Sequence, residues 1–263
     1  MLNKILLFAI LISTTMGAIA QHDGYQAKEY IANNGDTLMY RALQPETIVE
    51  NVKYPLVLFL HGAGERGSNN SSQLQHGSMQ FTNPVNREAY PSFVLFPQCP
   101  EDKYWAPSTR PSKFDASQFP MNDSISNPLG MVEELLEQTV RDYPIDTNRI
   151  YIIGLSMGGM GTYDIVVRNP NMFAAAVAIC GAVNPERLRE METDTQFRLY
   201  HGDADSVVPV DFSREAYKAL KQTGKNVEYF EFPGVNHGSW DPAFNQPDFI
   251  TWLYSQNKEN KQD

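Results

Sequence analysis

One short segment constrains the fold more than any other: residues 149–159, which read RIYIIGLSMGG. An apolar run leads into the turn G-L-S-M-G, and a stretch of helical character follows it. A strand that bends this sharply into a helix has no space for side chains at two positions, and glycine stands at both, 154 and 158. The segment predicts a strand, a tight turn and a helix, with the Ser156 hydroxyl lifted above a sheet edge at the positive end of the helix.

Apolar runs of strand length recur along the chain. The run YPLVLFL at residues 54–60 is too short for a helix and lacks polar alternation, which is typical of a strand buried on both faces of a parallel sheet. Similar runs lie at residues 93–96, 149–153, 174–179, 197–200 and 227–232. Nearer the N-terminus, residues 25–32 and 37–43 flank the turn N-N-G-D and predict an antiparallel hairpin.

Helical segments fit between these runs. One begins with Asn127 as its cap and Pro128 at its first position, and it gathers apolar residues on one face. A second follows Ser156, a third covers residues 211–222, and a last one starts near Pro247. The alternation predicts a single α/β domain, with a mostly parallel, doubly wound sheet and an N-terminal antiparallel hairpin. In such sheets, sites form at the carboxyl ends of the strands.

The first twenty residues predict an export signal. A single lysine precedes an apolar stretch, and A-I-A gives the small-x-small pattern of a cleavage site, so we expect removal of residues 1–20 between Ala20 and Gln21. The mature protein would then work outside the cytoplasm and keep no membrane segment. The domain is expected to span residues 21–257, with a frayed polar tail at residues 258–263.

Charge and residue types exclude several partners. The net charge of −10 carries no basic cluster, which argues against nucleic acid because phosphate binding needs clustered Lys and Arg. No polyphosphate loop occurs and no two histidines stand at ligand spacing, so neither a cofactor nor a metal is expected. Cys99 and Cys180 follow apolar runs and are expected to be buried and unpaired.

A serine hydroxyl becomes nucleophilic only when a base removes its proton and a carboxylate orients that base. In strand-turn-helix sites of this kind the acid and then the histidine follow the serine along the chain. Downstream of Ser156 stand His201 and His237. His201 comes before the acids of its own loop, which does not fit an order in which the acid precedes the histidine. His237 is therefore the predicted base. Asp205 is preferred to Asp203 as the acid, and His201 is expected to be a structural hydrogen-bonder.

A tetrahedral intermediate at Ser156 needs two N–H donors that are already in place. The amide of Met157, directly after the serine, is the first candidate. The second lies in the turn H-G-A-G at residues 61–64, where small residues let backbone approach the oxyanion. Ala63 is preferred, with Gly62 and Gly64 as alternatives.

The pocket residues are predicted from position alone. Residues 97–127 form a connection too long to be simple, which is typical of a lid or pocket wall. Trp105 on this loop and Trp240 after His237 are candidates for stacking on substrate, although ordinary packing is the alternative. Glu65 is a further candidate contact, with a local ion pair to Arg66 as its alternative.

Together these motifs resemble the α/β-hydrolase superfamily, and within it bacterial secreted esterases related to polyhydroxybutyrate depolymerases and feruloyl or acetylxylan esterases. The matching blocks are HGAGERG (61–67), FPQCP (96–100), RIYIIGLSMGGMGTYD (149–164), ICG (179–181), HGDADSVVP (201–209) and NHGSW (236–240). The resemblance implies Ser156 as nucleophile, Asp205 as orienting acid and His237 as base. Some relatives carry an added immunoglobulin-like domain, for which this chain is too short.

Three functions remain open at this point. The first is a secreted serine carboxylesterase acting on a small ester or an acylated carbohydrate, such as an acetyl or feruloyl ester, by a Ser-His-Asp acyl-enzyme route. The second is a serine peptidase of the prolyl-oligopeptidase type, which shares this catalytic domain. The third is an inactive carbohydrate-binding relative. The intact serine, acid, histidine and glycines favour an enzyme.

Overall fold

The computed structural model describes residues 24–106, 111, 113–121 and 124–259. The predicted export signal and residues 260–263 of the predicted tail lie outside this part. The strands are β1 (Gln26–Ile31), β2 (Thr37–Leu43), β3 (Tyr54–Leu60), β4 (Phe93–Pro97), β5 (Ile145–Leu155), β6 (Ala175–Ile179), β7 (Gln196–Gly202) and β8 (Val227–Phe232). The helices are α1 (Met79–Thr82), α2 (Pro84–Ala89), α3 (Asn127–Asp142), α4 (Met157–Arg168), α5 (Pro185–Glu190), α6 (Asp211–Gln222), α7 (Trp240–Phe244) and α8 (Phe249–Ser255), with 3₁₀ turns η1 (Ala63–Glu65), η2 (Ser72–Leu74) and η3 (Ala116–Gln118).

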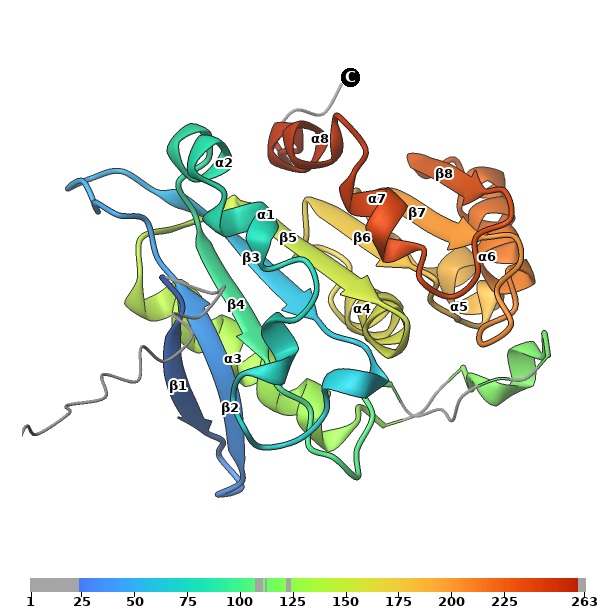
Figure 1. The fold of residues 1–263 in the computed structure, drawn as a ribbon, viewed down its shortest axis with the longest axis horizontal. Helices are drawn as coiled ribbons and strands as arrows, with labels where there is room; N and C mark the ends of the chain where they lie inside the picture. Colours follow the sequence, from blue (N-terminus) through green and yellow to red (C-terminus); the bar gives the residue numbers. More distant parts are fainter. Residues whose placement is uncertain (1–23, 107–110, 112, 122–123, 260–263) are drawn as a thin grey trace, which may run out of the picture.

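These strands form one twisted sheet in the order β1-β2-β4-β3-β5-β6-β7-β8 (Figure 1). β1 pairs antiparallel with β2, and β2 pairs antiparallel with β4, whereas every pair from β4 to β8 is parallel. The predicted hairpin and the predicted mostly parallel sheet are thus both confirmed. The carboxyl ends of β3, β5, β6, β7 and β8 therefore lie along one edge.

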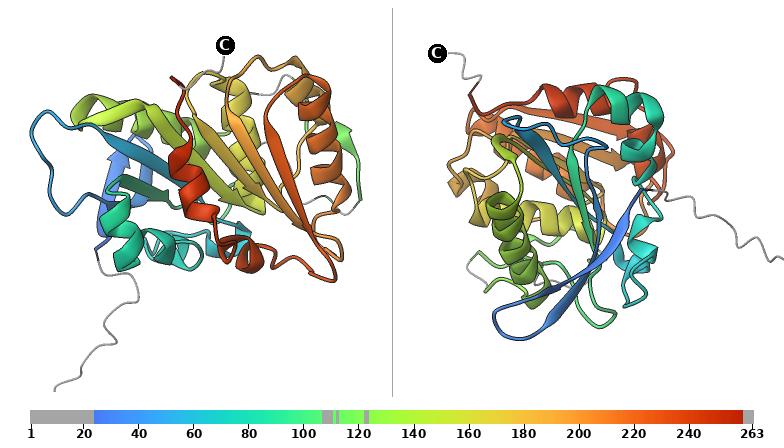
Figure 2. Two further views of the ribbon diagram at one scale, coloured as in Figure 1. Left: turned by 90° about the horizontal axis from the view of Figure 1, so that it is seen from above. Right: turned by 90° about the vertical axis from the view of Figure 1, so that its left-hand side faces the viewer.

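Two apolar layers sandwich the sheet. Alternate residues of β3 point to opposite faces: Leu56 and Leu58 join one cluster of buried side chains, and Val57 and Phe59 join the other. This is why the run at residues 54–60 shows no polar alternation. Helices α3, α4, α5 and α6 cover the first face, and α1, α2, α7 and α8 cover the second (Figures 1 and 2).

Two local predictions are corrected. The cap of α3 is Ser126, one residue before the expected Asn127, and its Oγ accepts from the amide of Leu129 at 3.3 Å. The described start of the polar tail is held rather than frayed, because Lys258 donates through its backbone amide to Asn148 and through Nζ to Asn171. Within the described residues, no helix is long and apolar enough to cross a membrane.

Candidate active site

Ser156 occupies a strained turn between β5 and α4. Its backbone has φ 54° and ψ −117°, a conformation that non-glycine residues rarely adopt. The amide of Ser156 donates to Ile179 O at 2.8 Å, and its carbonyl accepts from Met160 N, so backbone on both sides holds the turn. The hydroxyl is thereby presented at the sheet edge, at the N-terminus of α4, as the sequence predicts.

Close backbone contacts explain the glycines of this turn. A Cβ placed on Gly154 would overlap the carbonyl of Gly158, and one on Gly158 would overlap the carbonyl of Leu60 at the end of β3. Gly159 in turn approaches Gly181 after β6, where an added Cβ would lie 2.9 Å from the Cα. The helix can therefore start close against the strands only because these side chains are absent.

A continuous hydrogen-bonded line joins three side chains from three different strand ends. Ser156 Oγ lies 2.8 Å from His237 Nε2, and His237 Nδ1 lies 2.8 Å from Asp205 Oδ2. Ser156 follows β5, Asp205 follows β7 and His237 follows β8. Asp203, the alternative acid, is instead exposed and accepts from Gly234 N at 2.6 Å. The imidazole is thus placed to take a proton from the hydroxyl, with the carboxylate fixing its tautomer.

Asp205 is held by four donors. Oδ1 accepts from the amides of Val207 and Val208 at 2.8 and 2.9 Å, and Oδ2 faces both His237 Nδ1 and, at 3.2 Å, His201 Nε2. Burial alone would raise the pKa of Asp205, but the hydrogen bonds from the two histidines and the two amides outweigh it, so the pKa lies well below its usual value. The carboxylate is therefore ionised at neutral pH.

The two other turn histidines have structural partners. His201 is fully buried, with Nδ1 2.7 Å from Ser213 Oγ and Nε2 3.0 Å from Val208 O. His61 accepts from Cys99 N at Nε2, so its Nδ1 carries the proton and donates to Gly62 O at 2.6 Å. Burial lowers the pKa of His61 to about 4, which keeps the ring neutral.

The two amides predicted to stabilise an oxyanion both line the pocket over Ser156. Met157 is the first residue of α4, and Ala63 is the first residue of η1. Within the described part of the chain, neither amide donates a hydrogen bond to another protein group. Both are therefore available to a ligand oxygen.

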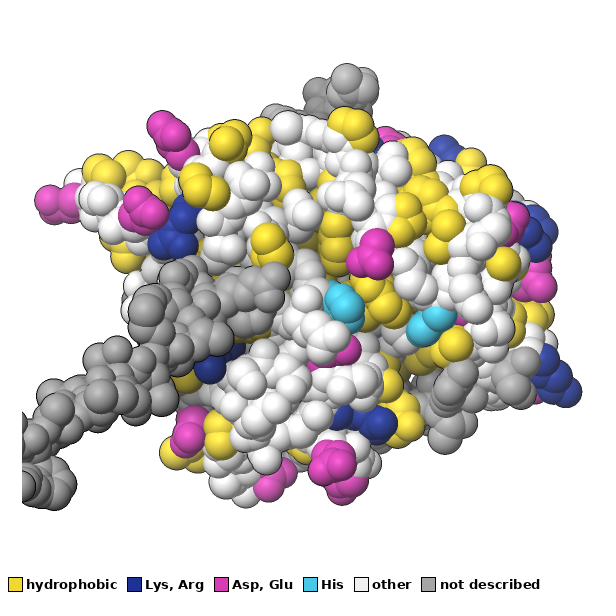
Figure 3. Space-filling model, in the orientation of Figure 1, with side chains coloured by type: hydrophobic (Ala, Val, Ile, Leu, Met, Phe, Trp, Pro, Cys, Tyr) yellow, Lys and Arg dark blue, Asp and Glu magenta, His cyan; other side chains and the backbone are white. Residues whose placement is uncertain are grey.

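A pocket of about 420 Å³ opens at the hydroxyl of Ser156. It lies between the turn after β3, the start of α4 and the loops after β7 and β8. Histidine side chains reach the surface near the middle of the face of the molecule drawn in Figure 3. Its lining residues are Gly62, Ala63, Gly64, Glu65, Arg66, Tyr104, Leu155, Ser156, Met157, Met160, Val207, Val208, His237 and Trp240.

The two tryptophan candidates for stacking on substrate lie in different surroundings. Trp240 lines the pocket, and its ring lies 5.5 Å from that of His237 and 5.1 Å from that of His76. Trp105, the other candidate for stacking on substrate, is instead fully buried, as the packing alternative predicts, and its Nε1–H donates to His61 O at 3.1 Å. Its neighbour Tyr104 lines the pocket instead, and no pattern in the sequence singles it out.

The alternative ion pair between Glu65 and Arg66 is also wrong. Arg66 Nε donates to Ala63 O at 2.9 Å, and the guanidinium lies over the Tyr104 ring, 4.6 Å from its centroid. Glu65 turns the other way, with Oε1 3.7 Å from His76 Nε2. Both residues nevertheless line the pocket.

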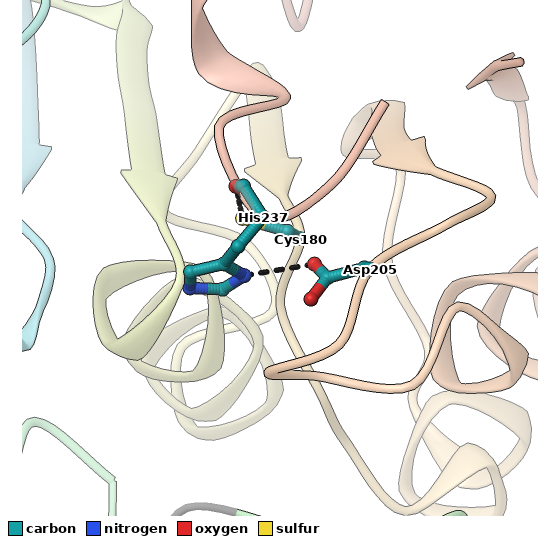
Figure 4. A group of neighbouring side chains, drawn as sticks. All are labelled: Cys180, Asp205 and His237. Carbon is teal, nitrogen blue, oxygen red and sulfur yellow. Dashed lines mark hydrogen bonds and ion pairs between the residues drawn. The ribbon is translucent and has the colours of Figure 1, made fainter. Parts of the chain in front are cut away.

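One cluster in the site has atoms of metal-ligand type. Cys180 Sγ, a carboxylate oxygen of Asp205 and a ring nitrogen of His237 lie within 4.8 Å of one another (Figure 4). These atoms are already engaged, because His237 binds Asp205 and the Cys180 thiol lies 3.6 Å from His237 O as a donor. Burial raises the pKa of the thiol to about 12, so the thiol keeps its proton at neutral pH in the structure as it stands. Cys180 and Cys99 are both buried and unpaired, as predicted.

The chain is similar to known esterases and thioesterases, in sequence or in fold. A model of the phospholipase/carboxylesterase family matches residues 47–250. A solved structure described as a thermostable esterase is 35% identical, with a TM-score of 0.78 over 90% of this chain, and the chain spans 64% of that protein's length. A CE1 ferulic acid esterase from Anaeromyces mucronatus, in complex with ferulic acid, shares the fold at 18% identity (TM-score 0.63, 92% of this chain and 93% of that one). Acyl-protein thioesterase 1 of Debaryomyces hansenii is 24% identical over 70% of this chain and 84% of its own.

Proposed function

Because the chain belongs to the phospholipase/carboxylesterase family and is a serine ester hydrolase, we propose that Ser156, His237 and Asp205 are its catalytic triad. One observation carries this proposal. Two successive 2.8 Å contacts run from Ser156 Oγ through the imidazole of His237 to Asp205 Oδ2. No other described histidine contacts a pocket-lining hydroxyl.

The reaction follows from this geometry. Ser156 Oγ attacks the ester carbonyl while His237 Nε2 takes its proton, and the amides of Met157 and Ala63 donate hydrogen bonds to the oxyanion that forms. The tetrahedral intermediate collapses, and the alcohol leaves with the proton held on His237. Water, deprotonated by the same imidazole, then attacks the acyl-enzyme; the acyl–Oγ bond breaks, Ser156 Oγ regains the proton from His237, and the acid is released. Asp205 keeps the Nδ1 proton in place throughout.

We further propose that the substrates are acetyl or feruloyl esters on carbohydrate, met outside the cytoplasm after cleavage between Ala20 and Gln21. Three observations support this. The first twenty residues carry the pattern of an export signal. Trp240 and Tyr104 place aromatic rings at the pocket. A ferulic acid esterase shares the fold.

A hydrolysis panel tests the proposal. Purified protein is assayed on p-nitrophenyl acetate, methyl ferulate, acetylated xylan and a prolyl amide, beside Ser156→Ala. Loss of the serine is expected to lower kcat by several orders of magnitude, roughly 10⁶ in related chemistry. Ser255→Ala, an exposed serine at the end of α8, should retain full activity.

Each alternative has its own result. Turnover that persists in Ser156→Ala would disprove the triad. Cleavage of the prolyl amide without any ester turnover would indicate a peptidase. Binding of xylan with no turnover of any compound would indicate an inactive relative. Mass spectrometry of the protein exported by a secreting host, compared with the mass of the full-length chain, would detect loss of residues 1–20.

A further inference from the structure

The carboxylate of Glu65 is an unusual group in this pocket. The side chain is only 9% exposed, and within the described part of the chain it accepts no hydrogen bond. Oε2 is fully buried without a hydrogen-bond donor, with His61 Nδ1 4.0 Å away, and His76 Nε2 lies 3.7 Å from Oε1, so both imidazoles are beyond hydrogen-bonding distance. A buried carboxylate without donors is costly, so a ligand that brings a donor to this group would stabilise it.

The position of this carboxylate places it beside the nucleophile. A Cβ added to Gly62 would lie 2.9 Å from Leu155 Cδ1, 3.1 Å from Glu65 Oε2 and 3.7 Å from Ser156 Cβ, so the carboxylate and the serine side chain both approach this glycine. Glu65 belongs to the same short turn as Ala63, whose amide is the proposed second oxyanion donor. A group bound by Glu65 therefore sits within a few bonds of the reacting carbonyl.

Neighbouring groups narrow what the carboxylate can bind. Arg66 does not neutralise it, because the guanidinium donates to Ala63 O and Lys103 O. The same arginine lines the pocket and would repel a second cation, while Glu65 itself would repel an anionic ester. Trp240, which packs against His76, adds an apolar face at the same pocket. A neutral, hydroxylated group suits this combination.

We propose that Glu65 accepts a hydrogen bond from a neutral hydroxyl that the substrate carries close to its ester bond. This inference rests on the proposed role of Ser156. A hydroxyl that donates to a carboxylate makes a short, charge-assisted hydrogen bond, about twice as strong as a neutral one. The pocket then selects hydroxylated esters over otherwise matched esters. The hydroxyl belongs either to the alcohol part of the substrate or to its acyl part.

Two pairs of esters test the proposal and separate these sources. Monoacetin and propyl acetate differ by hydroxyls on the alcohol part, and methyl 3-hydroxybutyrate and methyl butyrate differ by a hydroxyl on the acyl part. We expect kcat/KM to favour the hydroxylated member of one pair by roughly 10-fold or more. Glu65→Gln should reduce the ratio of kcat/KM within that pair by roughly 10-fold. Glu88→Gln, an exposed glutamate of α2, is the matched control.

The preference ratio distinguishes recognition from a structural role. If Glu65 only held its turn in place, Glu65→Gln would lower kcat/KM for both members of a pair equally, and the inference would be wrong. The preference of the unaltered enzyme decides the matter should Glu65→Gln misfold, because equal turnover within both pairs overturns the proposal. Faster hydrolysis of acetylcholine than of monoacetin would also overturn it. Absence of turnover for every ester would instead refute the proposed function.

Discussion

Replacing Asp205 by asparagine tests the proposed triad more sharply than removing the serine. The carboxylate accepts from four donors: two backbone amides at Oδ1 and two imidazoles at Oδ2. Asparagine has one oxygen and one NH₂ group, so it can serve only one of these two sides. With its oxygen toward the amides of Val207 and Val208, its NH₂ group faces His237 and His201.

In that orientation His237 must accept at Nδ1 and carry its proton at Nε2, where it cannot take the proton of Ser156. Loss of the correct tautomer costs roughly 10⁴ in kcat for this kind of triad. The opposite orientation leaves two buried amides facing a donor, at roughly 1–3 kcal/mol each. We therefore expect Asp205→Asn to lose about 10⁴ in kcat and at least about 2 kcal/mol of unfolding free energy.

The assays are p-nitrophenyl acetate hydrolysis and urea unfolding, with Asp203→Asn as the control. Asp203 lies two residues away, is exposed and accepts only from Gly234 N among the described residues, so its replacement should change kcat less than 3-fold, roughly the scale of surface substitutions. A loss below 10-fold in Asp205→Asn, or an equal loss in Asp203→Asn, would refute the reasoning.

Three further predictions concern groups around the hydrogen-bonded line of Ser156, His237 and Asp205. Because burial lowers the pKa of His61 to about 4, the unfolded chain binds its proton more readily between pH 4 and 6.5. The free energy of unfolding should therefore fall by up to about 3 kcal/mol as the pH drops from 6.5 towards 4. In urea unfolding, His61→Gln should show a smaller change over this pH range than the unaltered protein. Gly158→Ala would force a Cβ into the Leu60 carbonyl and should cost more than about 3 kcal/mol, whereas Gly64→Ala, with open space around it, should cost under about 1 kcal/mol, as thermal melts would show. Trp240→Ala should raise KM for methyl ferulate several-fold with less change for p-nitrophenyl acetate, a split that steady-state kinetics would reveal.

The sequence predicted the sheet well because strand burial leaves a strong local signal. The run at residues 54–60 coincides with β3, which is buried throughout, and the segments at residues 227–232 and 211–222 coincide with β8 and α6. The helices that no pattern indicated are α1, α2, α5 and α7, each of four to six residues. So few residues complete hardly more than one turn, and their apolar positions show no helical period.

Chain order predicted which side chains meet at Ser156, because parallel strands deliver their following loops to one edge. The structure brings Ser156, His237 and Asp205 within hydrogen-bonding distance, and their catalytic role stays a prediction. Periodicity carries no such information for loops. Trp105 and Tyr104 are adjacent in sequence, yet one is buried beneath Gly161 and the other lines the pocket, since the path of the loop decides which ring faces inward.

The residues that select the substrate are the part of the site that the sequence predicts least well. The contacts within residues 62–76 show why. Glu65 follows a turn whose glycines the sequence makes conspicuous, but its lack of a partner depends on where Arg66 and His76 come to rest. Arg66 donates to the carbonyls of Ala63 and Lys103, and the His76 ring packs against Trp240 with its Nε2 3.7 Å from the carboxylate. The same packing places Trp240 between His76 and the His237 ring. One cluster thus links the proposed base to the proposed hydroxyl acceptor, so substitutions at Trp240 should change both turnover and substrate preference.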